Sequence, residues 1–151
     1  MDIRDRALNY LANRSRTAKE MVDHLKAKGF PMEEIEPTLE FLKDFSYIDD
    51  SDYCRQYFDY AFGKGRGIQR VKQELVNKGV DSQIIAIAIE DYESETTELQ
   101  RAKKQAAKLI ANGETVEDKL LAKMGRKLTA LGYTTDVVYK VVGEYMRGEH
   151  D

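Results

Sequence analysis

The stretch LVNKGV at residues 75–80 decides the fold, because the chain repeats its pattern twice more. LKAKGF stands at residues 25–30 and LTALGY at residues 128–133. In each stretch a leucine precedes a glycine by four residues, and a large apolar residue follows the glycine. A helix often ends with one residue in the left-handed conformation, which glycine adopts without a Cβ clash. Each stretch therefore predicts the end of a helix.

Apolar residues recur at the same offsets around the three glycines, Gly29, Gly79 and Gly132. These offsets are eight and four residues before each glycine, and six, ten and thirteen residues after it. They are spacings along one face of a helix, so they predict one helix before each glycine and another shortly after it. The predicted core positions are Met21, Leu25, Ile35, Leu39, Leu42, Val71, Leu75, Ile85, Ile89, Tyr92, Met124, Leu128, Val138, Val142 and Tyr145.

A further helix is predicted before each of these pairs, at residues 2–13, 51–62 and 97–112. Side-chain pairs three residues apart, of the kind that cap helix starts, support several of the predicted beginnings. They are Thr17 with Glu20, Thr97 with Gln100, and Thr115 with Asp118. No segment shows a convincing two-residue alternation of apolar and polar side chains, so we expect no sheet.

The sequence therefore predicts an all-α protein with about nine helices in three tandem three-helix repeats. The predicted boundaries are residues 1–48, 49–95 and 96–148, followed by a polar tail at 149–151. The glycines are 50 and 53 residues apart (79 minus 29, and 132 minus 79). This period exceeds the roughly 33 to 34 residues of ankyrin and tetratricopeptide repeats. A unit of this size is near the lower limit for independent folding, so neighbouring repeats should stack.

Composition limits the classes of function that the chain can have. The 24 basic and 27 acidic residues give a net charge of −3, which argues against a protein that binds mainly to DNA phosphates. The mean hydropathy of −0.60 is typical of a water-soluble protein. Residues 1–10 lack the apolar core of a signal peptide, and the one cysteine, Cys54, suits a reducing compartment. We therefore expect a cytoplasmic protein without a membrane span.

Several stretches together resemble the RecX family, which regulates the bacterial recombinase RecA. They are KGRGIQRVKQELVNKGV at 64–80, YIDDSDYCRQY at 47–57, ALNYLANRSRTAKEMVDHLKAKGF at 7–30 and KLLAKMGRKLTALGY at 119–133. The resemblance covers nearly the whole chain, from about Ala7 to Tyr145. It implies an all-helical, elongated and curved body of three tandem three-helix repeats.

The resemblance also implies a function. Such proteins bind the RecA–single-stranded-DNA filament and modulate it, mostly by inhibition of its growth, ATP hydrolysis, strand exchange and co-protease activity. Because the repeats stack within one chain, we expect a monomer.

Basic turns in the first two predicted repeats are the candidate contact surface. They are NRSR at 13–16 and GKGRG at 63–67, whereas NGET at 112–115 in the third repeat is not basic. GKGRG lacks the spacing of a phosphate-binding loop and follows a predicted helix instead of a strand. Such charges could bind acidic protein groups or DNA phosphates, although charged side chains are also normal on any solvated face. The candidate basic residues are Arg14, Arg16, Lys64, Arg66, Arg70 and Lys72.

Tyr53, Tyr57 and Tyr60 lie on one stripe of the predicted helix at 51–62. One explanation is burial of this central helix against both neighbouring repeats. The other is an exposed surface for a partner, because tyrosine is favoured at interfaces. Burial is favoured for most of these rings, and Tyr53 and Tyr57 are included among the candidate partner-binding residues.

No stretch predicts a catalytic, cofactor or metal site. DDSD at 49–52 lacks the further ligands of a calcium loop and is interpreted as a cap of the following helix. Cys54 has no histidine near it in sequence, since His24 and His150 are the only two. We therefore expect no enzyme and no cofactor.

The leading hypothesis is a non-catalytic regulator that binds the RecA filament. The alternatives are a helical module that binds nucleic acid directly and a generic helical scaffold for an unrelated partner.

Overall fold

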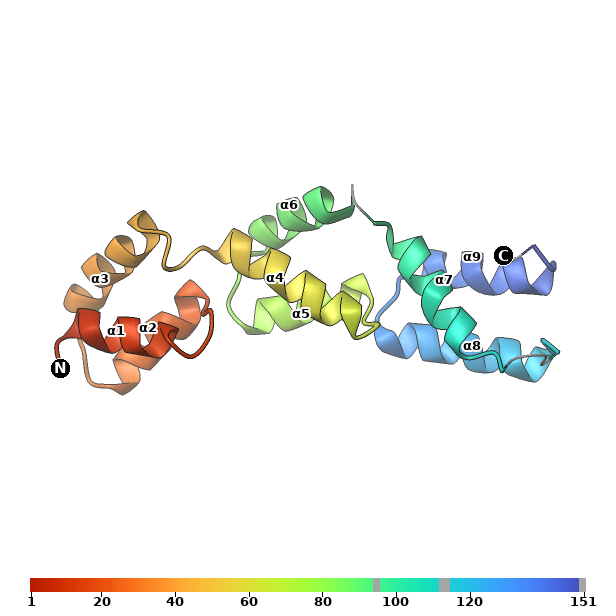
Figure 1. Ribbon diagram of the computed structural model, residues 1–151, viewed down its shortest axis with the longest axis horizontal. Coiled ribbons are helices and arrows are strands. Elements are labelled where there is room, and N and C mark those ends of the chain that lie inside the picture. The colour runs from red at the N-terminus through yellow and green to blue at the C-terminus, as the bar shows by residue number, and fades with distance from the viewer. Residues whose placement is uncertain (94–95, 112–114, 150–151) are drawn as a thin grey trace. The chain divides into compact units, whose positions relative to one another are not determined.

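The computed structural model describes residues 1–93, 96–111 and 115–149. The remaining residues, which include parts of the predicted turn at 112–115 and of the predicted tail, lie outside the described residues. Over the described ranges the chain forms helices and no strand, so the all-α prediction is confirmed. The helices are α1 (Ile3–Leu11), α2 (Ala18–Ala27), α3 (Met32–Asp44), α4 (Asp50–Gly63), α5 (Ile68–Asn77), α6 (Ser82–Glu93), α7 (Glu98–Lys108), α8 (Asp118–Leu131) and α9 (Thr135–Met146) (Figure 1).

The three repeated glycines end α2, α5 and α8 in the predicted way. Gly29, Gly79 and Gly132 have φ angles of 93°, 91° and 100°, which lie in the left-handed region. In each case the next residue donates its N–H to the carbonyl of the repeated leucine, at 3.1 to 3.2 Å. This backbone bond closes the last turn. The apolar side chain after each glycine packs inward, since Val80 and Tyr133 are buried and Phe30 packs against the core.

Two of the predicted capping pairs are confirmed and one is wrong. Thr17 and Thr97 each form a capping box, with Glu20 and Gln100 respectively. Thr115 does not cap α8, because the helix begins at Asp118 after the extended residue Glu117, whose side chain caps nothing. The Thr115 hydroxyl therefore stands two residues before the position from which a side chain can reach the first turn.

The first helix of the predicted third repeat is shorter than its apolar pattern suggested. We predicted a helix over 97–112, whereas α7 ends at Lys108. The N–H of Leu109 donates to the carbonyl of Ala106 and the N–H of Ile110 to that of Ala107, which makes a tight final turn. Leu109 and Ile110 then pack against the core as a non-helical segment. Their burial made the apolar pattern continue beyond the end of the helix.

The chain divides into two compact units. Unit 1 comprises residues 1–57 and 74–88, and unit 2 comprises residues 58–73 and 89–151. The division passes through α4, α5 and α6, so the boundaries predicted for three separate repeats stay a prediction.

In unit 1, α1, α2 and α3 pack on one another (Figure 1). Apolar side chains from all three helices and the turn after α3 form the core. Its buried members are Ala7, Met21, Leu25, Ile35, Leu42 and Ile48.

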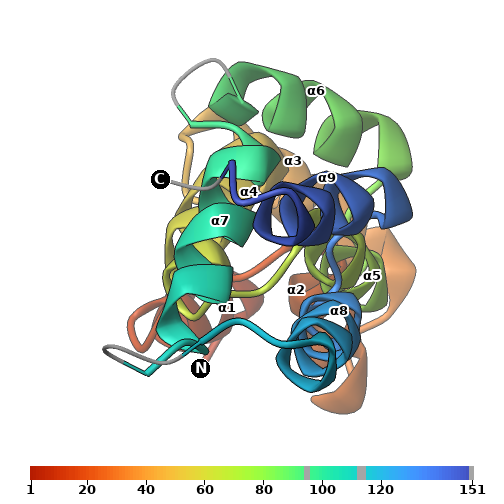
Figure 2. The same cartoon turned by 90° about the vertical axis from the view of Figure 1, so that its right-hand side faces the viewer.

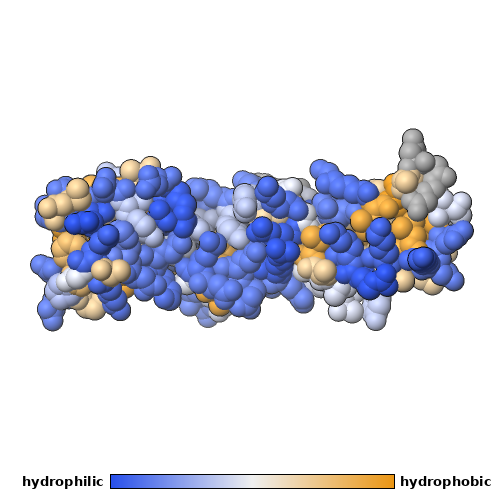
Figure 3. All heavy atoms as spheres, turned by 90° about the horizontal axis from the view of Figure 1, so that it is seen from below, coloured by the Kyte–Doolittle hydropathy of each residue, from blue (hydrophilic) through white to orange (hydrophobic). Residues whose placement is uncertain are grey.

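In unit 2, α7 packs across α8 and α9, which are seen nearly end-on in Figure 2. The core of these three helices consists of Ala102, Ala106, Met124, Leu128, Tyr133, Val138, Val141 and Tyr145. Most of the surface seen in Figure 3 is hydrophilic, with separate groups of hydrophobic atoms exposed.

The predicted core positions are buried with few exceptions. Leu39, Tyr92 and Val142 are only half-buried, because they lie at the edges of the apolar faces of their helices. Ala7, Ala102 and Ala106, which the periodicity around the glycines did not include, are fully buried. Their small side chains allow the first helix of each group to approach its neighbours closely.

In unit 1 the N-terminal end of α2 contacts the start of α4 and the end of α5. The N–H of Ala18, the first residue of α2, donates to Oδ1 of Asp50 at 3.0 Å. The hydroxyl of Thr17 donates to the carbonyl of Lys78 at 2.7 Å. A Cβ on Gly79 would overlap the side chain of Lys19, so the end of α5 lies against the start of α2.

Unit 2 repeats this junction with different residues. The N–H of Ile68, the first residue of α5, donates to Oε1 of Glu98. The N–H of Gly67 donates to the carbonyl of Leu131 at 2.7 Å. A Cβ on Gly132 would overlap Arg70, so the end of α8 lies against the start of α5. In both units the carboxylate comes from the first residue of a helix, α4 or α7.

The helices of the described residues include none that combines the length and the apolar character needed to cross a bilayer.

Candidate partner-binding surfaces

The predicted contact residues of unit 1 lie in the turn between α1 and α2, but their side chains take different roles. Arg14 is half exposed and forms an ion pair with Glu20 at 3.2 Å. Because Glu20 also completes the capping box of α2, this pair links the turn to the helix start. Arg16 instead places its guanidinium carbon 3.8 Å from the ring centre of Tyr10.

Tyr10 is also stacked on His24, with ring centres 3.7 Å apart and planes 4° from parallel. Two groups this close to one ring centre would collide on the same face, so Arg16 and His24 cover opposite faces of Tyr10. Arg6 of α1 and Lys28 at the end of α2 bring further positive charge near His24. We name these five residues, Arg6, Tyr10, Arg16, His24 and Lys28, the Tyr10 cluster.

The surroundings of His24 in the Tyr10 cluster lower its pKa. Burial lowers the pKa of His24, and the charges of Lys28, Arg16 and Arg6 lower it further. The uncharged imidazole is therefore favoured at neutral pH, because its protonated form would add another positive charge to the cluster.

The two candidate tyrosines of α4 are directed into unit 1. Tyr53 is only 9% exposed and stacks beside Tyr57, with ring centres 6.3 Å apart. The Tyr57 hydroxyl donates to Oε1 of Glu74 at 3.0 Å, and the ammonium group of Lys78 lies 5.5 Å from its ring centre. Little of Tyr53 is accessible to a partner in this conformation, whereas Tyr57 is half-buried.

In unit 2 the basic turn surrounds an exposed tyrosine. Tyr60 is 53% exposed, and Lys64 and Arg66 lie 5.8 and 5.5 Å from its ring centre. Arg70 and Lys72 are exposed on α5. The structure thus groups Lys64 and Arg66 around Tyr60, a tyrosine that was not included in the candidate set.

Beside this turn lies a cavity of about 380 Å³, which we name the α7 pocket. The Gly65 backbone contacts α7 so closely that a Cβ there would meet the Gln105 side chain at 2.7 Å. The pocket lining is basic and amide-rich. It consists of Phe62, Gly63, Thr96, Gln100, Arg101, Lys104, Gln105 and Lys108.

Arg101 forms the fixed part of this pocket. Its side chain is only 10% exposed and lies over the Phe62 ring, 3.9 Å from the ring centre. It donates to the Thr96 carbonyl at 3.0 Å and pairs with Glu93. Its Nε is buried without an acceptor in the described part of the chain. The exposed Lys104 and Lys108, one turn apart on α7, supply the accessible charge.

Sequence reasoning missed the α7 pocket because it compared only the three turns. The third turn is not basic, but the charge of that region is carried by the helix that precedes it. The sequence RAKKQAAK at 101–108 contains the signal, since its basic residues recur at helical spacing.

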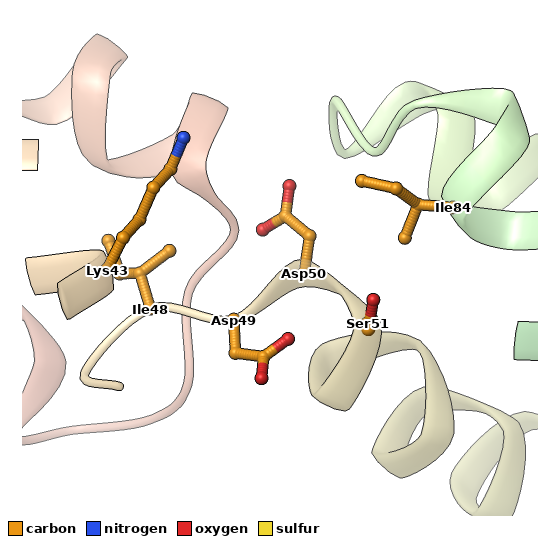
Figure 4. A pocket seen from close by; sticks show the side chains of 6 residues that line it. All are labelled: Lys43, Ile48, Asp49, Asp50, Ser51 and Ile84. Carbon is orange, nitrogen blue, oxygen red and sulfur yellow. The ribbon is translucent and has the colours of Figure 1, made fainter. Parts of the chain in front are cut away.

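The acidic stretch at 49–52 borders a second cavity, of about 280 Å³, in unit 1 (Figure 4). Asp49 caps α4 as predicted, since its Oδ1 accepts the N–H of Asp52 at 3.1 Å. Asp50 instead caps α2, a contact between helices that the sequence did not predict. Burial raises the pKa of Asp50, although the bond from Ala18 opposes this. In Figure 4 the two carboxylates point away from each other, and the described residues contain no cluster of three or more metal-ligating side chains.

Cys54 is buried in unit 1, and burial raises the pKa of its thiol to about 11. The thiolate, which is the reactive form, is therefore strongly disfavoured at neutral pH.

Family models match two parts of the chain. The RecX first three-helix domain matches residues 4–42, and the RecX second three-helix domain matches residues 49–89. The chain belongs to the RecX family. The resemblance stated from the sequence is thus confirmed, and so is the fold of tandem three-helix domains.

Curated RecX proteins align with most of this chain. A protein named regulatory protein RecX from Listeria welshimeri is 32% identical over 135 residues, which are 88% of this chain and 50% of the relative. One from Clostridium beijerinckii is 29% identical over 153 residues, covering 100% of this chain and 71% of the relative. The chain thus spans about half the length of the Listeria relatives that it matches.

Solved RecX structures share the fold. The crystal structure of RecX from Lactobacillus salivarius has a TM-score of 0.84 and 25% identity, and the alignment covers 96% of this chain and 95% of that one. A second crystal structure, of regulatory protein RecX, has a TM-score of 0.77 and 28% identity, with 94% and 71% covered.

Proposed function

We propose that this RecX-family chain is a regulatory protein that binds the RecA–single-stranded-DNA filament and inhibits its growth. The observation that carries the proposal is the match of both RecX domain models, together with a fold shared with a solved RecX structure over almost the full length of both chains. The expected consequences are lower ATP hydrolysis, strand exchange and co-protease activity of the filament.

The two basic surfaces suggest how the chain binds. A RecA–DNA filament presents phosphates and acidic side chains, and both attract exposed lysine and arginine. The Tyr60 turn with the α7 pocket provides one such surface in unit 2, and the Tyr10 cluster provides another in unit 1. A chain bound across adjacent filament subunits would obstruct the addition of new ones.

The test is the ATP turnover of RecA on single-stranded DNA with increasing amounts of the protein. We expect a progressive decrease of turnover. The variant Lys64→Gln/Arg66→Gln/Lys104→Gln/Lys108→Gln should need about tenfold more protein for the same inhibition, equal to about 1.4 kcal/mol of binding. Its matched control neutralises four exposed lysines elsewhere: Lys26→Gln, Lys123→Gln, Lys127→Gln and Lys140→Gln.

Unchanged turnover at a several-fold excess of the wild-type chain would refute the proposal. If both four-site variants weaken inhibition equally, the effect reflects total charge and the α7 pocket has no special part in binding.

A second candidate function is direct binding of single-stranded nucleic acid. The observation in its favour is the exposed ring of Tyr60, flanked by Lys64 and Arg66 beside the basic α7 pocket. Aromatic platforms next to basic grooves bind single strands without base readout. Titration of the protein with a thymidine oligomer distinguishes the two functions, since this mode requires tight binding that weakens steeply with salt.

We assign no catalytic reaction to the chain. The pKa of Cys54, about 11, makes it a poor nucleophile, and its side chain is buried.

A further inference from the structure

The Tyr10 cluster concentrates positive charge that the described part of unit 1 does not neutralise. Arg6, Arg16 and Lys28 form no ion pair with any described residue, although ion pairs occur nearby between Arg14 and Glu20. The Nε atoms of Arg6 and Arg16 are buried and have no acceptor among the described residues. Stacking on Tyr10 holds the Arg16 guanidinium in place, and a guanidinium presents its terminal N–H donors in a fork that matches a carboxylate.

A related arrangement around Tyr57, in the same unit, includes the negative charge that the Tyr10 cluster lacks. Five residues before Gly79 stands Glu74, which accepts the Tyr57 hydroxyl near Lys78. Five residues before Gly29 stands His24, while Lys28 corresponds to Lys78. The second repeat thus places a carboxylate beside its tyrosine and lysine, and the first repeat places an imidazole there.

We propose that the Tyr10 cluster is a binding site for a carboxylate side chain in an acidic segment of a partner protein. The carboxylate would lie among Arg6, Arg16 and Lys28 and supply the charge that Glu74 supplies in the second repeat.

The geometry favours an acidic protein segment over nucleic acid. Both faces of Tyr10 are covered, by Arg16 and His24, so no face of this ring is left for a base to stack on. In unit 2, by contrast, the Tyr60 ring is exposed.

His24 makes this site sensitive to pH. The groups that face it are Tyr10 and Arg6 of α1, Arg16 of the turn, and Lys28 on its own helix, and all the charged ones are positive. A bound carboxylate reduces their repulsion of a proton on His24. The carboxylate should therefore raise the pKa of His24, and by linkage the site should bind it more tightly when His24 is protonated.

The inference rests on the proposed function only for the identity of the partner, which would be a RecA subunit of the filament. The site itself is tested without RecA.

The probe is an eight-residue aspartate peptide, whose side chains stay ionised at pH 5.5. Binding is measured at pH 5.5 and pH 7.5, and the ring signals of His24 are followed by NMR. The chain has only one other histidine, His150, which serves as the internal reference. We expect a raised pKa of His24 in the presence of peptide and at least about threefold tighter binding at pH 5.5.

Three variants define the site. Arg6→Gln/Arg16→Gln should weaken peptide binding about tenfold, whereas the exposed control Lys26→Gln/Lys123→Gln should lose less than about twofold. His24→Gln should still bind the peptide but lose the dependence on pH. Helical circular dichroism verifies that each variant is folded.

The proposal is overturned if the peptide leaves the His24 titration unchanged, or if Arg6→Gln/Arg16→Gln and its control lose affinity equally. It is also overturned if an eight-nucleotide thymidine oligomer shifts His24 more than the peptide does, because the site would then prefer phosphate. Loss of RecA inhibition in Arg6→Gln/Arg16→Gln would identify RecA as the partner. Inhibition unchanged despite peptide binding would instead indicate another acidic protein.

Discussion

Unit 1 and unit 2 contain the same junction between helices, but they bury it to different extents. In unit 1 the carboxylate of Asp50 accepts one N–H, from Ala18, and remains half exposed. In unit 2 the carboxylate of Glu98 is only 8% exposed and accepts backbone N–H groups from Ile68 and Thr134. One acidic residue thus holds the starts of α5 and α9 together.

The close contacts at the junction glycines also make unit 2 the more tightly packed of the two. In unit 1 a Cβ on Gly79 would overlap side-chain atoms of Lys19, of which Cγ and Cδ can move whereas Cβ is fixed by the backbone. In unit 2 Gly132 faces the backbone of Arg70 and Gly67, and the buried hydroxyl of Tyr133 donates to the Gly65 carbonyl at 3.0 Å. Backbone cannot yield as a flexible side chain does, so unit 2 should tolerate change less than unit 1. The two units thus share the same arrangement of contacts at this junction but differ in its rigidity.

The largest expected effect is at the glycines. Gly132→Ala should reduce the free energy of unfolding by about 3 kcal/mol or more, because the new Cβ combines left-handed strain with a clash 2.8 Å from the Arg70 nitrogen. Gly29→Ala should cost about 1 kcal/mol, since the same strain occurs with nothing within 4 Å. Urea unfolding followed by circular dichroism measures both. Equal losses would show that the contact in unit 2 is not rigid.

A smaller difference is expected at the two carboxylates. Glu98→Ala leaves buried N–H groups without an acceptor and should cost about 2 to 3 kcal/mol. Asp50→Ala should cost about 1 kcal/mol, because water can reach the half-exposed site of Ala18. Thermal unfolding of the two variants and wild type compares them. A larger loss for Asp50→Ala than for Glu98→Ala would reverse the proposed order of rigidity.

The smallest expected effect is the pH dependence of stability in Glu98→Gln and Asp50→Asn, which replace each carboxylate by an amide of the same shape. Burial raises the pKa of Glu98, although the bond from Ile68 and the charge of Arg101 oppose this, so the folded state holds that proton more strongly than the unfolded chain. Stability supplied by this group is present below the ordinary value of 4.5 and is lost as pH rises through the folded pKa. Glu98→Gln cannot titrate, so its stability relative to wild type should increase between pH 4 and pH 7.

The stability of Asp50→Asn relative to wild type should likewise increase as the pH rises above 3.8, because burial raises the pKa of Asp50 as well. The measurement is urea unfolding at a series of pH values for wild type and both variants. A relative stability that falls with rising pH would mean that the ionised carboxylate is favoured in the fold.

Local patterns predicted much of each unit. The helix ends at Gly29, Gly79 and Gly132 were predicted from one short phrase, because glycine adopts the left-handed conformation that often ends a helix. The capping boxes of α2 and α7 needed only residues three apart. The prediction failed at Thr115 and at the end of α7, where the backbone conformation of neighbouring residues and packing on the core override the local signal.

The surfaces were predicted less well than the helices. Lys64 and Arg66 were identified as neighbours because they share a turn, but Lys104 and Lys108 come from a helix almost 40 residues later in sequence (104 minus 66 is 38). Tyr10 could not be associated with Arg16 and His24 from spacing alone. Their contact requires the packing of α1 on α2 and a specific course of the turn between them.

The sequence by itself determined most of the helix ends, which faces are apolar and to which family the chain belongs. These properties depend on residues within a few turns of one another, and the same backbone chemistry recurs in every repeat. Only the tertiary structure decided which carboxylate holds which helix start, which tyrosine is exposed, and which positive charges face one another without a described counterion. These contacts join residues 14 to 61 positions apart, and their geometry is set by how whole helices pack.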